Sequence, residues 1–390
     1  ARLFPAMIRL AVDVEQVTRQ LFEPLMMQVI HWFTKNQTEE NTETMTLLDS
    51  IIECAASPSD GSVREFSAKC LTEFLKWSIK QSSKKQQEKN PFNAKSLFKR
   101  VYSLMHHPNP YKRMGAYLTV KSLYRVFREE LALVDQFVLE LSHALLFSMR
   151  LAQHDDSSLG TVRLALSVLE ALTRIIERHV TVLSKPNNAR RAHADLNAFL
   201  SWVLSQTARP ERVVRRAAQG LITRLTAPSA SAWLHKYVLP RRPLSTLISL
   251  FEGGVEYEEH DDQQLQRAVV SNKEPLPSLP DLAGLMTWLS RVQASLDLWT
   301  WAFSVGMLLP GEVLAAKNGS RLINWCAHFL THYQLLSVTT DENNVHYYLF
   351  RPLTPLEVDQ FFTQQCAILH LYFKLLHVLL DKHKQASMDS

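Results

Sequence analysis

The stretch that decides the fold reads AKSLFKRVYSLM at 94–105, HHPNP at 106–110 and YKRMGAYLTVKSLYRVFR at 111–128. Pro108 and Pro110 interrupt it in the middle, because proline offers no N–H and restricts the residue before it. On both sides of this turn apolar side chains recur at helical spacing, at Leu97, Phe98, Val101, Tyr102 and Met105 and then at Ala116, Val120, Leu123 and Phe127. The stretch therefore predicts a hairpin of two helices, each with one apolar face.

The same pattern recurs in two other places along the chain. Arg64, Arg113 and Arg215 each follow a proline-bearing turn. Each is followed by a small residue at +3 and apolar residues at +7 and +10, namely Ser67, Leu71 and Phe74, then Ala116, Val120 and Leu123, then Ala218, Ile222 and Leu225. Any amphipathic helix gives this apolar spacing, but the shared proline, arginine and small residue favour true repeats that resemble HEAT repeats. Such hairpins bury one face by stacking on their neighbours. The sequence therefore predicts an all-α fold, a HEAT-like α-solenoid of stacked antiparallel helical hairpins.

Composition along the chain predicts four segments. They are 1–184, HEAT-like hairpins with a basic block at 76–128; 185–252, further helical repeats; 253–280, a mobile acidic and proline-rich loop; and 281–390, C-terminal helical repeats. A short strand is possible at 345–350. The first residue is Ala1, with no cleavable leader pattern after it, so we expect the sequence to be a section of a longer chain.

The composition argues against catalysis by this chain itself. Only 10 of the 390 residues are glycine, although nucleotide-binding loops need glycine where backbone approaches phosphate. No P-loop, dinucleotide-binding, nucleophile-elbow, zinc-protease or protein-kinase motif is present. The four cysteines lie far apart and predict reduced, mostly buried thiols. No stretch is long and apolar enough to predict a membrane span. We therefore expect no catalytic residue, no bound cofactor and no metal ion in this chain.

The segment 326–332 is a candidate metal site. Cys326 precedes His328 and His332, and the two histidines are spaced i, i+4, so a helix could present all three to zinc. A half-buried helix whose histidines bind backbone or solvent is the more ordinary interpretation. The acidic segment 256–262 lacks the ordered spacing of a calcium loop and is better interpreted as a solvated loop.

Charge is the positive functional signal in the sequence. Residues 76–128 contain thirteen Lys or Arg and one acid, Glu88, which gives this block a net charge of +12. Because the net charge of the whole chain is +5, the remaining residues carry a net charge of −7. Such a block can contact phosphates without reading sequence. An acidic protein partner and a plain solvated face are the alternatives. The candidate contact residues for nucleic acid or a partner are Lys80, Lys84, Lys85, Lys89, Lys95, Lys99, Arg100, Lys112 and Arg113.

Runs of several residues resemble the DNA-dependent protein kinase catalytic subunit family, within the phosphatidylinositol-3-kinase-related kinases. The runs are 2–14, 17–21, 30–34, 73–81, 86–89, 95–100, 127–130, 137–140, 158–161, 174–178 and 251–254, whereas 185–194 and 255–280 depart from the pattern. The matching part of the family is its HEAT-repeat scaffold, from the end of the N-terminal arm into the circular cradle. Similarity to that scaffold again implies an all-α repeat fold.

The resemblance implies a nuclear Ser/Thr protein kinase that acts in double-strand break repair by non-homologous end joining. It implies double-stranded DNA and the Ku heterodimer as partners. The kinase motifs of the family lie outside this stretch, so ATP and Mg²⁺ are implied only for the absent kinase domain and no catalytic residue is transferred here. The expected role is a scaffold segment around DNA and Ku, and the alternative is a free-standing HEAT adaptor for a protein partner.

Overall fold

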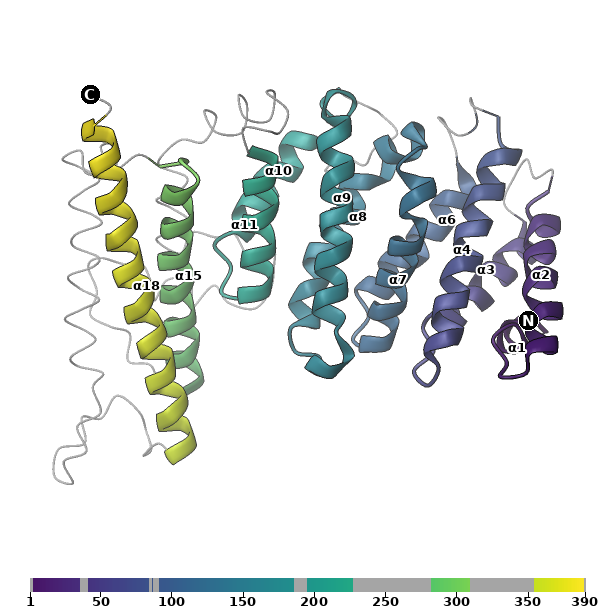
Figure 1. The fold of residues 1–390 in the computed structure, drawn as a ribbon, viewed down its shortest axis with the longest axis horizontal. Coiled ribbons are helices and arrows are strands. Elements are labelled where there is room, and N and C mark those ends of the chain that lie inside the picture. Colours follow the sequence, from purple (N-terminus) through teal and green to yellow (C-terminus); the bar gives the residue numbers. More distant parts are fainter. Residues whose placement is uncertain are drawn as a thin grey trace. The chain divides into compact units, whose positions relative to one another are not determined.

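A computed structural model of the chain describes residues 3–35, 41–83, 86, 91–185, 195–226, 282–308 and 354–388. Within those ranges the ordered elements are α-helices and one 3-10 turn, without a strand (Figure 1). The all-α repeat fold predicted from the sequence is confirmed. The predicted acidic loop at 253–280 and the strand considered at 345–350 lie outside the described residues, as do parts of the helical segments predicted at 185–252 and 281–390.

The chain divides into two compact units, Ala1–Val203 with Arg224–His235, and Leu204–Thr223 with Lys236–Ser390. The helices of the first unit are α1 (Leu3–Leu10), α2 (Gln16–Phe33), α3 (Thr42–Ala55), α4 (Gly61–Gln81), α6 (Phe92–Met105), α7 (Pro110–Phe127), α8 (Leu131–Ala152) and α9 (Thr161–Leu183), with the 3-10 turn η1 (Ser157–Leu159) before α9. Farther along the chain lie α10 (Leu196–Gln206), α11 (Arg212–Thr226), α15 (Leu282–Ser304) and α18 (Pro355–Met388).

The first unit has two layers of helices. The pairs α3/α4, α6/α7 and α8/α9 are hairpins, and their second helices α4, α7 and α9 pack side by side in front of α3, α6 and α8 (Figure 1). We call the outward side of α4, α7 and α9 the second-helix face, and the outward side of α3, α6 and α8 the first-helix face. A side chain exposed on α6 therefore points to the opposite side of the unit from one exposed on α7.

The turn between α6 and α7 forms as the sequence predicts. The Asn109 side chain accepts a hydrogen bond from the N–H of Tyr111 at 2.9 Å and caps α7, and Pro110 occupies the first helical position. Proline is favoured there because its fixed φ suits a helix and its missing N–H would have no partner anyway. The predicted apolar faces of both helices are buried, except that Tyr102 is half-buried and donates its hydroxyl to Glu140 at 3.2 Å.

The start of α3 departs from what the local composition suggests. The polar sequence of residues 34–46 is typical of a loop, but α3 begins at Thr42. The Asn41 side chain accepts a hydrogen bond from the N–H of Glu43 at 2.8 Å, and the Glu43 carboxylate lies in the first turn, where the helix dipole favours it. These polar residues therefore start the helix, although their composition resembles that of a loop.

Gly115 lets the second helix of one hairpin approach the end of the preceding hairpin. A Cβ atom on Gly115 would overlap the carbonyl oxygen of Ala55 and lie 3.2 Å from the Cα atom of Ala56. The next residue, Ala116, is fully buried. Gly115, at +2 after Arg113, therefore sets the close packing of α7 on the C-terminus of α3.

Among the described residues, α8 alone is long and apolar enough to cross a membrane by length and composition. Within the first unit, 67% of that apolar window is buried against other helices. Its apolar composition is therefore accounted for by its central place between α6 and α9.

Candidate nucleic-acid interface

The arginine that marks each predicted repeat binds the turn that precedes its own helix. In each case the Nη1 atom donates to two consecutive backbone carbonyls of the turn. Arg64 donates to Ser57 at 2.7 Å and Pro58 at 3.4 Å, and Arg113 donates to His107 at 2.6 Å and Pro108 at 2.7 Å. Arg215 donates to Arg209 at 2.6 Å and Pro210 at 3.0 Å. Carbonyl groups in the turn between two helices have no helical partner, and a guanidinium can satisfy two of them together. The shared arginine is thus a structural device, which confirms the repeat.

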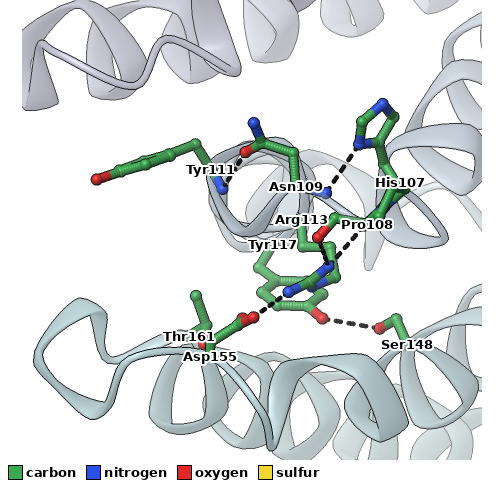
Figure 2. A network of polar contacts seen from close by, with 9 residues as sticks. All are labelled: His107, Pro108, Asn109, Tyr111, Arg113, Tyr117, Ser148, Asp155 and Thr161. Atoms are coloured by element: carbon green, nitrogen blue, oxygen red, sulfur yellow. Dashed lines mark hydrogen bonds and ion pairs between the residues drawn. The ribbon is translucent and has the colours of Figure 1, made fainter.

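Arg113 also reaches into the next hairpin (Figure 2). Its Nη2 atom pairs with Asp155, whose other carboxylate oxygen accepts a hydrogen bond from the Thr161 hydroxyl at 2.9 Å. Beside it the hydroxyls of Tyr117 and Ser148 form a hydrogen bond of 2.8 Å, and burial raises the pKa of Tyr117 to about 12. This network fastens α7 to the turn between α8 and α9. The sequence pattern does not indicate this pair, because Arg113 and Asp155 lie 42 positions apart.

The structure takes Arg113 out of the predicted contact surface. Its side chain is 2% exposed and its charge faces that of Asp155, so the prediction that it meets an outside anion is wrong. Arg100 is exposed by 24% and binds both carboxylate oxygens of Asp49, with Nη2 at 3.1 Å from Oδ2. Its charge is therefore largely matched within the protein.

The remaining predicted residues lie in different places. Lys95 and Lys99 are exposed on α6, Lys112 is half-buried at the start of α7, and Lys80 is exposed on α4. The Lys80 ammonium lies 4.9 Å from the centre of the Trp77 ring. Lys84, Lys85 and Lys89 lie outside the described residues. The predicted set is thus divided between two opposite faces of the first unit.

Acidic side chains surround the lysines of the first-helix face. On α3, Asp49 and Glu53 are exposed, and on α8, Asp135 and Glu140 are half-buried. Since α3 and α8 both pack against α6, these carboxylates flank the helix that carries Lys95 and Lys99. The strongly basic stretch in the sequence therefore becomes a surface of mixed charge on this side.

The second-helix face keeps more of its positive charge. Lys69 and Lys80 on α4 and Lys121 and Arg125 on α7 are exposed, and Lys76 on α4 is half-buried. In the part of the chain that the structure describes, Lys69, Lys121 and Arg125 form no ion pair. Thr72 and Ser122 join the two helices with a hydrogen bond of 2.8 Å. The two helices thus form one continuous basic surface.

The carboxylate of Glu73 on this surface is already bound. It accepts hydrogen bonds from Trp77 at 2.7 Å and Lys76 at 3.3 Å, and it meets the His31 ring at 2.9 Å. Burial alone would raise its pKa, but these bonds outweigh burial and hold the pKa of Glu73 below its ordinary value. Glu73 therefore stays ionised and holds Trp77 on the side of α4 that meets His31 of α2.

Lys69, Lys121 and Arg125 were missed as candidate contacts. Lys121 and Arg125 belong to the block 76–128 and are spaced i, i+4, which places them on one side of a helix. That signal was present in the sequence, because the apolar residues of the same helix mark the opposite, buried side. Lys69 comes before the block and gained its place only through the packing of α4 on α7.

Metal and thiol chemistry find no support in the described part of the chain. No three His, Cys, Asp or Glu residues lie there in positions that could hold a metal ion, and Cys326, His328 and His332 lie outside it. All three described cysteines are free; Cys366 is exposed, whereas Cys54 and Cys70 are buried, and burial raises the pKa of these two thiols, that of Cys54 to about 11. Such thiols stay protonated and unreactive at neutral pH.

Comparison with known proteins gives a consistent result over nearly the whole chain. Residues 1–389 match the family described as DNA-dependent protein kinase catalytic subunit, CC1/2. Proteins named DNA-dependent protein kinase catalytic subunit are 36% identical in Dictyostelium discoideum over 98% of this chain, and 40% identical in Gallus gallus over 84%. The one from Xenopus laevis is 33% identical over 99%. This chain covers only 10%, 8% and 10% of their respective lengths.

Proposed function

The chain belongs to the DNA-dependent protein kinase catalytic subunit family, and we propose that it is a non-catalytic scaffold segment of a DNA-damage-responsive Ser/Thr protein kinase. In this role it acts in the nucleus in double-strand break repair by non-homologous end joining, and it helps form the cradle around DNA ends and the Ku heterodimer. The family match over residues 1–389 carries the proposal. The chain spans about a tenth of the length of such relatives. The proposal places ATP and Mg²⁺ in a kinase domain outside this segment.

The use of polar residues supports a scaffold role. Arg64, Arg113 and Arg215 stabilise turns within hairpins, and Arg113 also joins one hairpin to the next. In the described residues most other charged side chains are exposed or half-buried, where they can meet a partner, although Arg209 and Asp297 are buried. These features suit a protein that holds macromolecules in place.

Complementation with the full-length kinase tests this proposal. Cells that lack the kinase would receive it with Arg113→Ala in this segment, or with Arg64→Ala as the matched control at the equivalent place in the preceding hairpin. We expect Arg113→Ala to reduce both end joining and DNA-stimulated phosphorylation by several fold, with ATP affinity unchanged. Limited proteolysis would show whether the segment of the Arg113→Ala protein has unfolded. If it has unfolded and end joining is still normal, the scaffold role is overturned. Loss of ATP affinity would instead point to a direct part in catalysis.

The size of the native protein separates this proposal from a free-standing adaptor. A scaffold segment of the kinase should be detected, with an antibody against residues 91–185, in a chain about ten times longer than 390 residues. A native chain of about the present length would support an adaptor that binds a protein partner and would overturn the kinase assignment.

A further inference from the structure

We propose that the second-helix face of α4 and α7 binds the phosphate backbone of double-helical nucleic acid, through Lys69, Lys80, Lys121 and Arg125. The proposal rests on the proposed function and assigns the contact to one face. It moves the contact away from α6, where the sequence placed it. It also adds Lys69, Lys121 and Arg125 to the contact residues predicted from the sequence.

The distribution of charge carries the first step. Four exposed cations lie on two neighbouring helices, together with two carboxylates of α4: Glu65 is exposed one turn before Lys69, and Glu73 is held by His31, Trp77 and Lys76. On the other side of the unit, Arg100 is paired with Asp49, and the acidic residues of α3 and α8 flank α6. Binding of a polyanion gains from unpaired cations because it releases counterions from the nucleic acid. The second-helix face therefore has the greater capacity for such binding.

The dimensions of the surface suit a duplex. Lys69 and Lys80 are eleven residues apart on one helix, which corresponds to about 16 Å along its axis at about 1.5 Å per residue. Neighbouring packed helices are separated by roughly 8–10 Å. Each strand of a duplex carries a phosphate about every 3.4 Å along its axis, so roughly five phosphates of one strand fit along α4. The cations of α7 add a second row beside it.

The chemistry of the surface disfavours other polymers. Protein interfaces need apolar anchors, and the large apolar side chains exposed in the described residues lie on other elements, none of them on α4 or α7. Unpaired bases need open aromatic rings. The Trp77 ring is covered by His31, with 4.0 Å between ring centres, and by the Lys80 ammonium. A regular phosphate backbone is the partner that needs neither feature.

Two matched pairs of substitutions test the assignment. Lys121→Glu with Arg125→Glu on α7 and Lys95→Glu with Lys99→Glu on α6 each replace two cations at i, i+4 in the same hairpin, with the same change in net charge. Binding of the 390-residue chain to a fluorescent 30-base-pair duplex would be measured by anisotropy at several salt concentrations. Circular dichroism melting would show that both variants remain folded. Two unrelated duplex sequences, a single strand and polyglutamate serve as probes.

We expect the α7 pair to weaken duplex binding by at least about 10-fold and to lower the slope of log affinity against log salt by about 2, one for each lost phosphate contact. The α6 pair should change the affinity by less than about 2-fold, and the two duplex sequences should bind equally. Equal losses from both pairs, a larger loss from the α6 pair, or polyglutamate binding as tight as duplex binding would each overturn the proposal. The anisotropy experiment needs neither Ku nor a kinase domain. The proposed duplex contact can therefore fail this test while the scaffold role passes the complementation test, and the scaffold role can fail while the duplex contact is supported.

Discussion

The turn between α6 and α7 and the second-helix face are both rich in cations, but they use their charge differently. At the turn, Arg113 is 2% exposed and is matched by Asp155 and two carbonyls. On the face, Lys121 and Arg125 lie on the same helix α7 and are exposed. Helix α7 thus carries two kinds of cation. Arg113 near its start joins two hairpins, whereas Lys121 and Arg125 farther along are exposed to solvent. A count of basic residues in the sequence cannot separate these roles.

The difference follows from the position of each side chain in the stack. The start of α7 lies beside the turn of the next hairpin, which supplies a carboxylate and excludes water. The second half of α7 turns one side outward, where solvent screens each charge and a surface ion pair contributes little to stability. Removal of a charge at the turn should therefore destabilise the protein. Removal of a charge on the second-helix face should affect binding and leave stability unchanged.

The largest effect is expected from Arg113→Ala. The substitution leaves the Asp155 carboxylate buried without its partner, and removal of one member of a buried ion pair typically costs about 3–5 kcal/mol. Urea denaturation followed by circular dichroism would give the loss in free energy of unfolding. Arg64→Ala is the matched control, because Arg64 binds the same kind of carbonyls but has the ring of Tyr111 at 5.7 Å in place of a carboxylate, and about 1 kcal/mol is expected.

A second substitution shows whether the orphaned carboxylate is the cause. Arg113→Met combined with Asp155→Leu removes both charges and should recover most of the stability that Arg113→Ala loses. If the double variant is as unstable as Arg113→Ala, the hydrogen bonds to the turn carbonyls matter more than the ion pair.

Gly115→Ala should have the next largest effect. The added Cβ atom meets the backbone of Ala55 and Ala56, which cannot move aside as a flexible side chain could. Overpacking of this kind costs about 1–3 kcal/mol, and the α3/α4 hairpin should separate from α6/α7 more easily. Hydrogen exchange of α3 and α7 would locate the change. Gly220→Ala on α11 is a suitable control, because a Cβ atom there has no neighbour within 4 Å, and it should leave stability unchanged or slightly raise it.

A smaller and pH-dependent effect is expected at Glu73, which joins α4 to α2. Because its folded-state pKa is below the ordinary value, the ionised carboxylate stabilises the fold above the unfolded pKa, about pH 4.3, and this stability is lost as pH falls through the folded pKa. The side chain is partly exposed, so the contribution should be less than about 1 kcal/mol. Thermal melting between pH 7 and pH 3 should show a shallower acid limb for Glu73→Gln than for the unaltered chain. An identical acid limb in both proteins would show that Glu73 makes no such contribution.

The smallest effect on stability is expected at Lys121 and Arg125, the residues at which the largest effect on duplex binding is expected. Lys121→Gln combined with Arg125→Gln should change the free energy of unfolding by no more than about 0.5 kcal/mol, since both side chains lie on the surface. A destabilisation comparable with that of Arg113→Ala would remove the distinction between the turn and the face.

Much of the fold could be predicted from the sequence, since helix boundaries depend on nearby residues. The prolines and Asn109 between α6 and α7, the spacing of the apolar residues and the repeated arginine all act over a few positions. The candidate contact site was less predictable. Of its described members, Arg113 became a buried structural residue, Arg100 became paired with Asp49, and Lys80 came to lie on the opposite side of the unit from Lys95 and Lys99.

By itself, the sequence determined that this chain forms repeated helical hairpins, that it belongs with the DNA-dependent protein kinase catalytic subunits, and that its positive charge is concentrated in one block. Local spacing and turn chemistry are sufficient for the first of these. Only the tertiary structure decided which cations face outward. Partners such as Asp155 for Arg113 and Asp49 for Arg100 come from residues 42 and 51 positions away, and stacking alone brings them together.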